Sequence, residues 1–323
     1  MKATMKRENM KKIILILLIM PALINDGLGQ SRKYFSYFNA LQSYYNPALV
    51  GLEGSSARSI VRNQWSGIDG GPKTVYGSVE GEFAQIGGSD SVPSIGRNAI
   101  GLSVMYDKHG AFSETELLLN YTNRIRLSEK HFLGLGIGVK YMNTELDGMS
   151  LSPEQSDDPS LSKYMGGFAE MKFLDFNFGL ALRHNNYYVA YAVQNLAAGK
   201  ISSGDEFYTK RPLSHNVQAG YRGVVSDNVG LIGNVLYRLQ EDLPYNAEFN
   251  FKALFMNKVW LGVGHRVDYS TGLQAGFLMN RVSVGYSYEM ATQRQSRMYG
   301  STHEFMASIR LFDHYGKGIM AMW

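Results

Sequence analysis

Apolar and polar side chains alternate along most of this chain, with the period of two that places every second residue on the same face of a β-strand. In the segment 281–290, Val, Val, Tyr, Tyr and Met share one parity, whereas Arg, Ser, Gly, Ser and Glu share the other. The segment 247–255 sets Ala and Phe against Glu, Asn, Lys and Leu in the same way. Each such segment predicts a strand with one apolar face and one mainly polar face.

The alternating segments are about ten residues long, which suits a tilted membrane-spanning strand of ~9–11 residues better than a soluble strand of about five or six. Beyond the first 29 residues, no run of ~18 apolar residues predicts a membrane helix. The predicted fold class is all-β, a transmembrane antiparallel β-barrel of about 14 strands. It is closed because an open edge in lipid would leave backbone groups unsatisfied. The predicted strands are 56–65, 74–84, 98–107, 114–126, 131–142, 174–183, 187–196, 214–224, 229–239, 245–255, 258–267, 270–279, 281–290 and 301–312.

The connections between these strands alternate in length, as expected for short periplasmic turns and longer extracellular loops. The short turns are rich in Asn, Asp and Ser, which suit tight turns. The connection 85–97 is the exception, because its position predicts a short turn. A soluble β-sandwich or propeller would explain the alternation, but not ten-residue strands with outward faces almost free of charge. The predicted short turns are 127–130, 184–186, 226–228, 256–257 and 279–280, and the long loops are 143–173, 197–213 and 291–300.

The first 29 residues have the pattern of a secretory signal peptide, with a basic head followed by about a dozen apolar residues at 13–24. We expect cleavage before Gln30. The remaining chain divides into a periplasmic N-terminal segment at 30–55, the barrel at 56–312 and a C-terminal tail at 313–323. Removing the signal's five basic and two acidic residues from the chain's 32 and 28 reduces the net charge from +4 to +1. So small a charge gives no indication of a nucleic-acid partner.

Charged residues gather on the face predicted to line the barrel, with both signs mixed. Their expected role is to form ion pairs across the lumen, and the alternative is a polar surface for a passing or docked polypeptide. A strongly selective pore usually carries one sign of charge at its constriction, and no such bias is visible. The predicted inner charges are Arg58, Arg62, Glu80, Glu82, Glu116, Arg124, Lys140, Arg183, Arg222, Arg238, Glu248, Lys252, Arg266, Glu289, Glu304 and Arg310.

Motifs for catalysis are weak throughout the chain. The seven histidines are scattered without metal-ligand spacing, and the chain has no cysteine for thiolate chemistry. Gly134, Gly136 and Gly138 superficially resemble a nucleotide-binding loop, but their spacing of two lies inside a strand pattern and predicts small residues facing the lumen. We therefore predict no enzyme activity, no cofactor and no metal.

Two short motifs are too particular for a generic barrel. One precedes the first strand, and the other ends that strand and forms a Gly- and Pro-rich loop beyond it. Further distinctive residues open the last strand. These motif residues are the candidate partner-binding positions: Asn46, Pro47, Gly51, Arg62, Gln64, Trp65, Gly67, Gly71, Pro72, Thr74, His303 and Glu304.

Together these residues closely resemble the signature of the PorP/SprF proteins, outer-membrane barrels of the Bacteroidetes type IX secretion system. The resemblance implies an integral outer-membrane protein with both termini in the periplasm, in contact with membrane lipid and lipopolysaccharide. It also implies a role in the secretion or surface attachment of a type IX substrate, often a large gliding adhesin recognised through its C-terminal domain. Recognition is expected on the outer loops at 66–73, 143–173, 197–213 and 291–300.

Two other functions remain open from the sequence. One is a diffusion porin or small-solute transporter. The other is a structural base for the secretion motor, which would bind periplasmic or peptidoglycan-binding proteins through residues 30–55 and the tail. In one respect the chain departs from the family pattern: residues 313–323 continue beyond Phe312, the expected terminal aromatic of the last strand. That tail is predicted to make a periplasmic contact or to act as a plug, with Trp323 as an alternative terminal aromatic.

Overall fold

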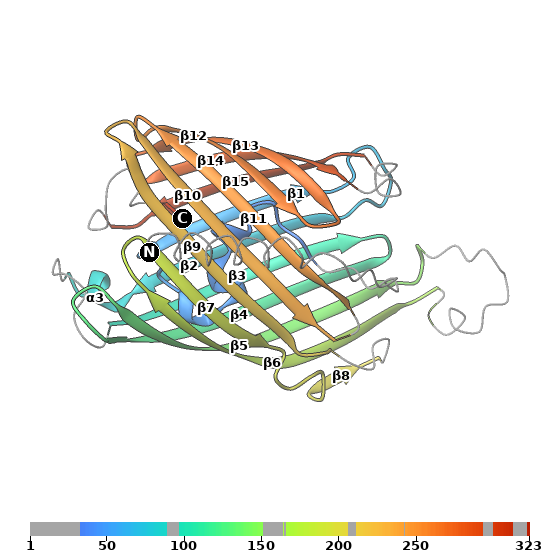
Figure 1. The fold of residues 1–323 in the computed structure, drawn as a ribbon. Helices are drawn as coiled ribbons and strands as arrows, with labels where there is room; N and C mark the ends of the chain where they lie inside the picture. The colour runs from blue at the N-terminus through green and yellow to red at the C-terminus, as the bar shows by residue number, and fades with distance from the viewer. Residues whose placement is uncertain are drawn as a thin grey trace, which may run out of the picture.

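Fourteen antiparallel strands close into a barrel in the computed structural model, which describes residues 33–88, 97–150, 164, 166–205, 211–241, 243–292, 300–312 and 322–323 (Figure 1). A further strand, β8, is three residues long and pairs with β6 outside the ring. The strands are β1 (Ser56–Asn63), β2 (Lys73–Glu82), β3 (Arg97–His109), β4 (Phe112–Arg126), β5 (Phe132–Asp147), β6 (Phe168–Arg183), β7 (Tyr187–Gln194), β8 (Ser202–Gly204), β9 (Ser214–Ser226), β10 (Val229–Gln240), β11 (Leu243–Phe255), β12 (Val259–Arg266), β13 (Ser270–Met279), β14 (Val282–Ala291) and β15 (Thr302–Arg310).

The ring closes between the first and last strands. β1 pairs with β15 in an unbroken antiparallel register, from Ser56 opposite Arg310 to Asn63 opposite His303. The remaining strands pair with their neighbours in sequence, apart from β7, which pairs with β9. Closure satisfies the edge hydrogen bonds that lipid could not supply, so the predicted fold class is confirmed.

The alternation of side chains sets which face of each strand points outward. On β4, Leu117, Leu119 and Tyr121 are exposed on the outer face, whereas Glu116 and Asn120 are buried inside. All of the predicted inner charges are buried except Arg183 and Arg310, which are half-buried. The outer surface is therefore an apolar band suited to lipid, and the polar parity lines the lumen, as predicted.

The two ends of the barrel differ in the length of their connections. One end, here called the short-turn end, carries the turns at 127–131, 184–186, 227–228, 256–258 and 280–281. The other, here called the long-loop end, carries 64–72, 148–167, 195–213 and 292–301 together with the shorter connections at 110–111, 241–242 and 267–269. In the turn at 256–258, Met256 and Asn257 both have positive φ, of 51° and 55°, the sign that a type I′ turn requires at its two central residues. The predicted short turns therefore lie together at one end, and the predicted long loops lie together at the other.

The exceptional connection between β2 and β3 contains a short helix, α3 (Phe83–Ile86), at the short-turn end. Within the described ranges no helix is long and apolar enough to cross a membrane. The signal peptide predicted at 1–29 and most of the tail at 313–323 lie outside the described residues.

Candidate functional site

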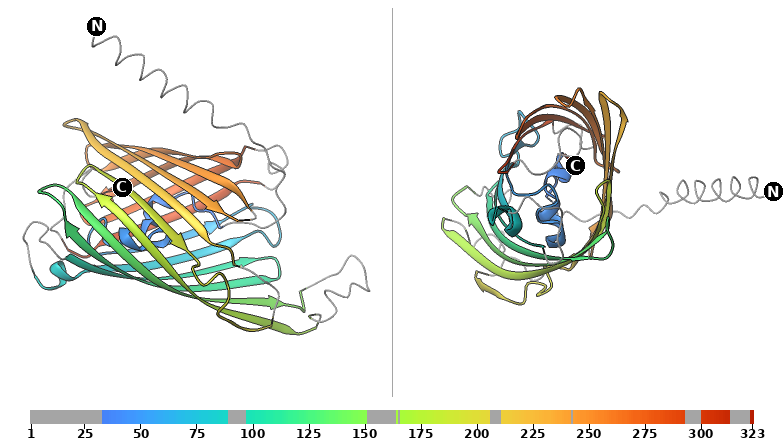
Figure 2. Two further views of the ribbon diagram at one scale, coloured as in Figure 1. Left: turned by 60° about the horizontal axis from the view of Figure 1, so that its bottom comes forward. Right: turned by 90° about the vertical axis from the view of Figure 1, so that its left-hand side faces the viewer.

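Residues 33–55, here called the luminal segment, lie inside the barrel (Figures 1 and 2). The segment contains two short 3₁₀ helices, η1 (Phe38–Ala40) and η2 (Pro47–Leu49), and one helical turn, α2 (Gln42–Tyr45). Most of its side chains are buried. We expected a periplasmic extension at 30–55, and the structure instead packs its described part against the inner wall of the ring. The segment runs from the long-loop half of the lumen at Lys33 to the short-turn end at Ser55.

One carboxylate holds the start of the luminal segment. Glu304, completely buried on β15, accepts hydrogen bonds from the backbone N–H groups of Ser36 at 2.8 Å and Tyr37 at 2.9 Å. The same carboxylate pairs with Arg62 of β1 at 3.0 Å. Charge-assisted bonds of this kind are roughly twice as strong as neutral ones. The pairing of β1 with β15, which closes the ring, is thereby linked to the luminal segment inside it.

From this carboxylate an unbroken line of ion pairs runs around the long-loop half of the lumen. Arg62 also pairs with Glu289 at 3.2 Å, and Glu289 pairs with Arg266 at 3.1 Å. Arg266 pairs with Glu248 at 3.0 Å, and Glu248 pairs with Arg238 at 2.5 Å. The charges alternate in sign over strands β1, β14, β12, β11 and β10. The prediction that inner charges of both signs pair with one another is confirmed for these residues, although the pairs join nearby strands along the wall and do not cross the lumen.

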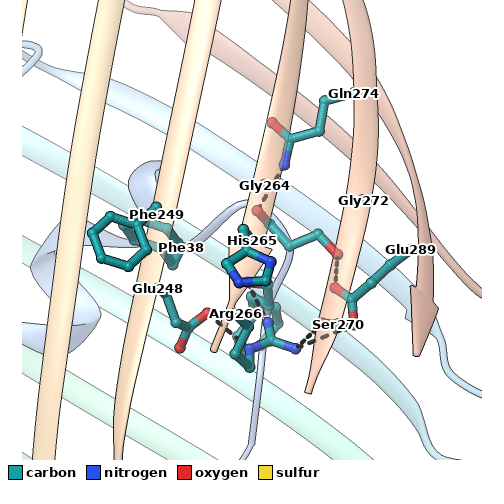
Figure 3. Close-up of a pocket in the computed structure, with 12 residues that line it drawn as sticks. Phe38, Glu248, Phe249, Gly264, His265, Arg266, Ser270, Gly272, Gln274 and Glu289 are labelled. Carbon is teal, nitrogen blue, oxygen red and sulfur yellow. Dashed lines mark hydrogen bonds and ion pairs between the residues drawn. The ribbon is translucent and has the colours of Figure 1, made fainter. Parts of the chain in front are cut away.

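The luminal segment bonds directly to this line of charges (Figure 3). Ser36 donates from its hydroxyl to Glu289 at 2.6 Å, and its carbonyl accepts from the amide of Gln274 at 2.9 Å. The carbonyl of Phe35 accepts from Arg266 at 3.3 Å. The cavity left between these groups is only about 10 Å³, room for roughly one water molecule. The contact is therefore tightly packed.

A second group of bonds holds the other end of the luminal segment near the short-turn end. Glu80 accepts from the backbone N–H of Gly51 at 2.6 Å and from the hydroxyl of Ser43 at 2.7 Å, and it pairs with Arg58 at 2.9 Å. Arg124 pairs with Glu82 and also donates to the carbonyl of Val50. A Cβ at Gly51, whose φ is +65°, would lie 2.6 Å from Nη2 of Arg124. Only glycine fits this position without strain.

Small residues on the barrel wall make room for the middle of the luminal segment. A Cβ at Gly136 of β5 would lie 2.2 Å from the backbone nitrogen of Ala48, and one at Gly134 would lie 3.0 Å from the carbonyl oxygen of Ala48. On β6, a Cβ at Gly179 would lie 2.0 Å from the amide oxygen of Asn46. The prediction that the β5 glycines face the lumen is confirmed, and Gly134 and Gly136 make room for η2.

The C-terminal residue also lies within the lumen, in its short-turn half. The Trp323 ring is stacked under the guanidinium of Arg222, 4.1 Å from the ring centroid, and meets Tyr188 edge-on at 4.9 Å. Its backbone N–H donates to Glu53 at 2.8 Å, and its carbonyl accepts from Asn39 at 2.7 Å. Trp323 is therefore held by both the wall and the luminal segment, which agrees with the plug alternative for the end of the tail.

The predicted motif residues fall into three places. Asn46, Pro47 and Gly51 belong to the luminal segment, where the Asn46 side chain caps η2 by accepting from the N–H of Ala48 at 2.9 Å. Arg62, Glu304 and Thr74 line the lumen, and Thr74 donates to Asp107 at 2.5 Å. The remaining residues lie at the long-loop end, and of these His303 is on the outer face, bonded to Tyr286 at 2.7 Å. Half of the motif residues therefore lie in the luminal segment or on the wall that lines the lumen.

Gln64, Trp65, Gly67, Gly71 and Pro72 form the connection between β1 and β2. The N–H of Gln64 donates to the carbonyl of Pro72 at 2.9 Å, which closes the base of the loop. Adjacent backbone bonds join the loop to residues 301 and 110 in neighbouring connections, at 2.8 and 3.2 Å. A Cβ at Gly71 would lie 2.8 Å from the carbonyl oxygen of Gln64. The loop is therefore a shaped part of the rim, and its role in binding a partner stays a prediction.

A cavity of about 450 Å³, here called the vestibule, occupies the long-loop half of the lumen beside the luminal segment. Lys33, Tyr44 and Tyr45 of the segment line one side, and the rest comes from strands β3 to β7 and β9 to β11 and from Asn195, Arg211 and Pro212 between β7 and β9. The strand pattern did not identify this cavity, because it depends on where the luminal segment stops. The volume lies within the roughly 300–1,000 Å³ of typical ligand sites.

Lys33 carries the main electrostatic contact of the luminal segment with the vestibule wall. Its ammonium pairs with Glu114 at 2.5 Å and with Glu116 at 2.7 Å. Burial alone would lower the pKa of Lys33, but these two carboxylates outweigh burial and raise that pKa above its usual value. The ammonium is therefore charged throughout the physiological pH range. In the described ranges no cluster of three or more His, Asp or Glu side chains could hold a metal ion.

A closed antiparallel barrel with an apolar outer band and a polar interior defines this chain as an integral outer-membrane protein. The chain belongs to the family of type IX secretion system membrane proteins PorP/SprF, whose model matches residues 27–309. No curated protein matches the chain in sequence.

Solved structures similar to this chain are outer-membrane barrels of low sequence identity. The toluene transporter TbuX of Ralstonia pickettii has a TM-score of 0.48 at 10% identity, over 88% of this chain and 97% of that one. A FadL homologue of Pseudomonas aeruginosa has a TM-score of 0.42 at 10% identity, over 84% and 94%. Omp33 of Acinetobacter baumannii has a TM-score of 0.44 at 11% identity, over 80% and 96%. At these values the likeness carries no inference about function.

Proposed function

We propose that this protein is a non-enzymatic outer-membrane component of type IX secretion that supports the secretion or surface attachment of a partner protein, such as a gliding adhesin. Membership of the family supports the secretion role. The luminal segment supports a role other than solute passage. It occupies the lumen with the protein's own chain and is held there by hydrogen bonds to Glu304, Glu289 and Glu80. A barrel filled in this way suits a docking platform for a polypeptide better than a passage for solutes.

The diffusion porin is the less favoured alternative for two reasons. Wall carboxylates hold the luminal segment at both ends, so opening a passage would require breaking the ion pairs of Lys33 together with the charge-assisted hydrogen bonds that these carboxylates accept from the segment. The mixed signs of the inner charges also provide no selective ring. Conductance of the purified protein separates the two functions and is considered in the Discussion.

The motor-base alternative places the partner in the periplasm, at the short-turn end. In the described part of the chain, that end presents short turns and the four-residue helix α3, whereas the vestibule and the shaped rim loop at 64–72 lie at the long-loop end. The larger and more varied surface favours an extracellular partner. The prediction of two periplasmic termini stays a prediction, since Lys33 lies in the long-loop half and Trp323 in the short-turn half of the lumen.

We predict that the long-loop end faces the cell exterior, and single cysteines can test this because the natural chain has none. Asp69→Cys at the long-loop end and Asp227→Cys at the short-turn end both replace exposed residues. In intact cells, a membrane-impermeant maleimide is expected to label Asp69→Cys alone. Asp227→Cys is expected to react only after the outer membrane is permeabilised. The unmodified chain is the blank, and the reverse labelling pattern would show the opposite orientation.

Deletion of the gene is expected to abolish surface display of at least one type IX substrate, while other outer-membrane proteins stay at normal levels. The measurement is quantitative proteomics of surface-shaved cells, with the complemented strain as control. If every substrate of the system is displayed normally without this protein, the proposed function is wrong. Substrates retained in the periplasm would indicate a role in export, whereas substrates lost to the medium would indicate a role in attachment.

A further inference from the structure

Two lysines lie directly opposite each other on the outer face of the barrel, at the long-loop end. Lys73 begins β2, Lys108 is the last residue but one of β3, and the antiparallel register of the two strands makes them partners. Both side chains are exposed. Directly opposite residues of a sheet have Cβ atoms only ~4.5–5.5 Å apart, so two like charges in these positions destabilise the pairing unless an opposite charge lies nearby.

The described part of the chain does not neutralise this lysine pair by contact. Neither ammonium group forms an ion pair or a hydrogen bond there. Asp107 precedes Lys108, but its side chain is buried on the luminal face, where it accepts a hydrogen bond from Thr74. Asp69 lies in the adjoining rim loop, is exposed and pairs with neither lysine. A counter-ion from outside the protein can therefore reach both ammonium groups.

An opposed pair of acidic residues on the same outer face shows the contrast. Glu145 of β5 lies directly opposite Glu170 of β6. There the protein itself relieves the repulsion, because Lys172 pairs with Glu170 at 2.8 Å and Asn143 donates to Glu145 at 2.9 Å. The lysine pair has no equivalent within the described ranges, which indicates that its counter-charge comes from the surroundings of the barrel.

Uncharged polar side chains continue the row of the two lysines on both sides. Asn63 of β1 lies opposite Lys73, and Ser113 of β4 lies opposite Lys108. Among the described residues, neither the Asn63 amide nor the Ser113 hydroxyl has a hydrogen-bond partner. The four adjacent strands β1 to β4 thus present two ammonium groups flanked by an amide and a hydroxyl.

The next row of outward side chains, toward the middle of the wall, is apolar. Val75 adjoins Lys73 on the outer face of β2, and Tyr106 adjoins the other lysine on β3. These two residues are again directly opposite each other, and their side chains are 47% and 43% exposed on the face that contacts lipid. Lysine and tyrosine both suit the boundary of a membrane, with an apolar stem or ring in the lipid and a polar end at the headgroups. The lysine pair therefore lies where lipid headgroups are expected.

We propose that Lys73 and Lys108 together bind a phosphate of a phosphorylated glycolipid in the outer leaflet of the membrane. A phosphomonoester carries a charge of about −1.5 to −2 at neutral pH, which matches two ammonium groups. Asn63 and Ser113 hydrogen-bond hydroxyls of the sugar, and the acyl chains lie against the apolar row beneath. The diester of a glycerophospholipid carries less charge and fits the site less well. The leaflet follows from the predicted orientation of the long-loop end, and the inference does not depend on a role in secretion.

The first test measures lipid binding to the purified full-length protein in a neutral detergent, by titration followed with native mass spectrometry. The probe is bisphosphorylated lipid A, and dephosphorylated lipid A with the same acyl chains is the matched control. A lysine near an anionic lipid contributes about fivefold to affinity, so the phosphorylated form should bind about 25-fold more tightly. Equal binding of the two forms would overturn the proposal. Phosphatidylglycerol that binds as tightly as lipid A would overturn it too, as would inorganic phosphate that displaces lipid A at equal concentration.

The variant Lys73→Gln/Lys108→Gln tests the residues themselves. It is expected to bind phosphorylated lipid A about 25-fold more weakly than the natural protein does and to bind the two forms equally. Lys73→Arg/Lys108→Arg keeps the charge and should keep the preference for the phosphorylated form. The control, Lys130→Gln/Lys258→Gln, makes the same change of charge at exposed turns of the short-turn end and should bind as the natural protein does. If the Lys73→Gln/Lys108→Gln variant retains the full preference, the two lysines do not form the site.

Discussion

Glu304→Gln is expected to destabilise the barrel by about 3 kcal/mol, near the lower end of the range for breaking one partner of a buried ion pair. The substitution leaves Arg62 buried with one carboxylate, Glu289, in place of two. It also replaces the charged acceptor of two backbone N–H groups, those of Ser36 and Tyr37, by a neutral one. The loss should appear as a lower urea midpoint for unfolding of the refolded protein in detergent, with an unchanged slope.

The matched control is Glu170→Gln, which breaks an ion pair of similar length on the surface. Glu170 pairs with Lys172 at 2.8 Å, but both side chains are more than 40% exposed, so no measurable change is expected. A double-mutant cycle with Arg62→Gln should return a coupling of about 1–3 kcal/mol between Arg62 and Glu304. If Glu304→Gln unfolds at the natural midpoint, the line of ion pairs does not hold the seam of the barrel.

The fold could be predicted from sequence because lipid imposes a simple rule on every strand. Residues such as Leu117, Leu119 and Tyr121 must be apolar to face the membrane, and their neighbours are free to be polar. The predicted ends were least accurate where strands leave the membrane. β5 continues to Asp147 and β6 begins at Phe168, beyond the predicted 142 and 174, because polar residues there still form backbone hydrogen bonds. The alternation of apolar and polar residues in the sequence therefore ends before the backbone pairing of the two strands ends.

The inner charges could also be predicted, but their partners could not. Arg62 pairs with residues 227 and 242 positions away, and those distances close only when β1 meets β15. Periodicity assigns a side chain to a face of its strand, whereas the height and angle around the ring that bring two side chains together depend on the register of all the strands between them.

The luminal segment is the largest feature that strand periodicity did not identify. Short helical turns have no extended period, so the alternation of side chains does not place this segment in the lumen, and the sequence predicts a periplasmic segment at 30–55 instead. The composition of the segment does indicate burial, because an extension in water would not need so many aromatic residues. Six lie between 34 and 45: Tyr34, Phe35, Tyr37, Phe38, Tyr44 and Tyr45. On the wall, Gly134 and Gly136 are the small residues that match the segment. The vestibule is bounded by the luminal segment as well as by the wall, so it cannot be predicted until the position of the segment is known.

Deletion of residues 33–50, with residues 1–32 retained, is expected to convert a barrel with little current into a channel with a steady ohmic conductance. The ion pairs among Arg62, Glu289 and Arg266 are formed by wall residues alone, so they can persist without the segment. The vestibule would then continue into the space that the segment leaves. Barrels of 16 to 18 strands hold open aqueous channels, and a ring of 14 is only slightly narrower. Single-channel recording in planar bilayers is the measurement.

A point substitution tests whether the luminal segment closes the barrel without shortening the chain. Gly136→Leu places a side chain where a Cβ alone would lie 2.2 Å from the backbone of Ala48, so η2 can no longer occupy its seat. We expect an intermittent current from this variant, because the bonds of Glu304 to Ser36 and Tyr37 still hold the start of the segment. Gly77→Leu is the matched control, since a Cβ at Gly77 meets nothing within 4 Å. If the natural protein conducts as strongly as the deletion variant, the luminal segment does not close the barrel, and the porin alternative gains the stronger support.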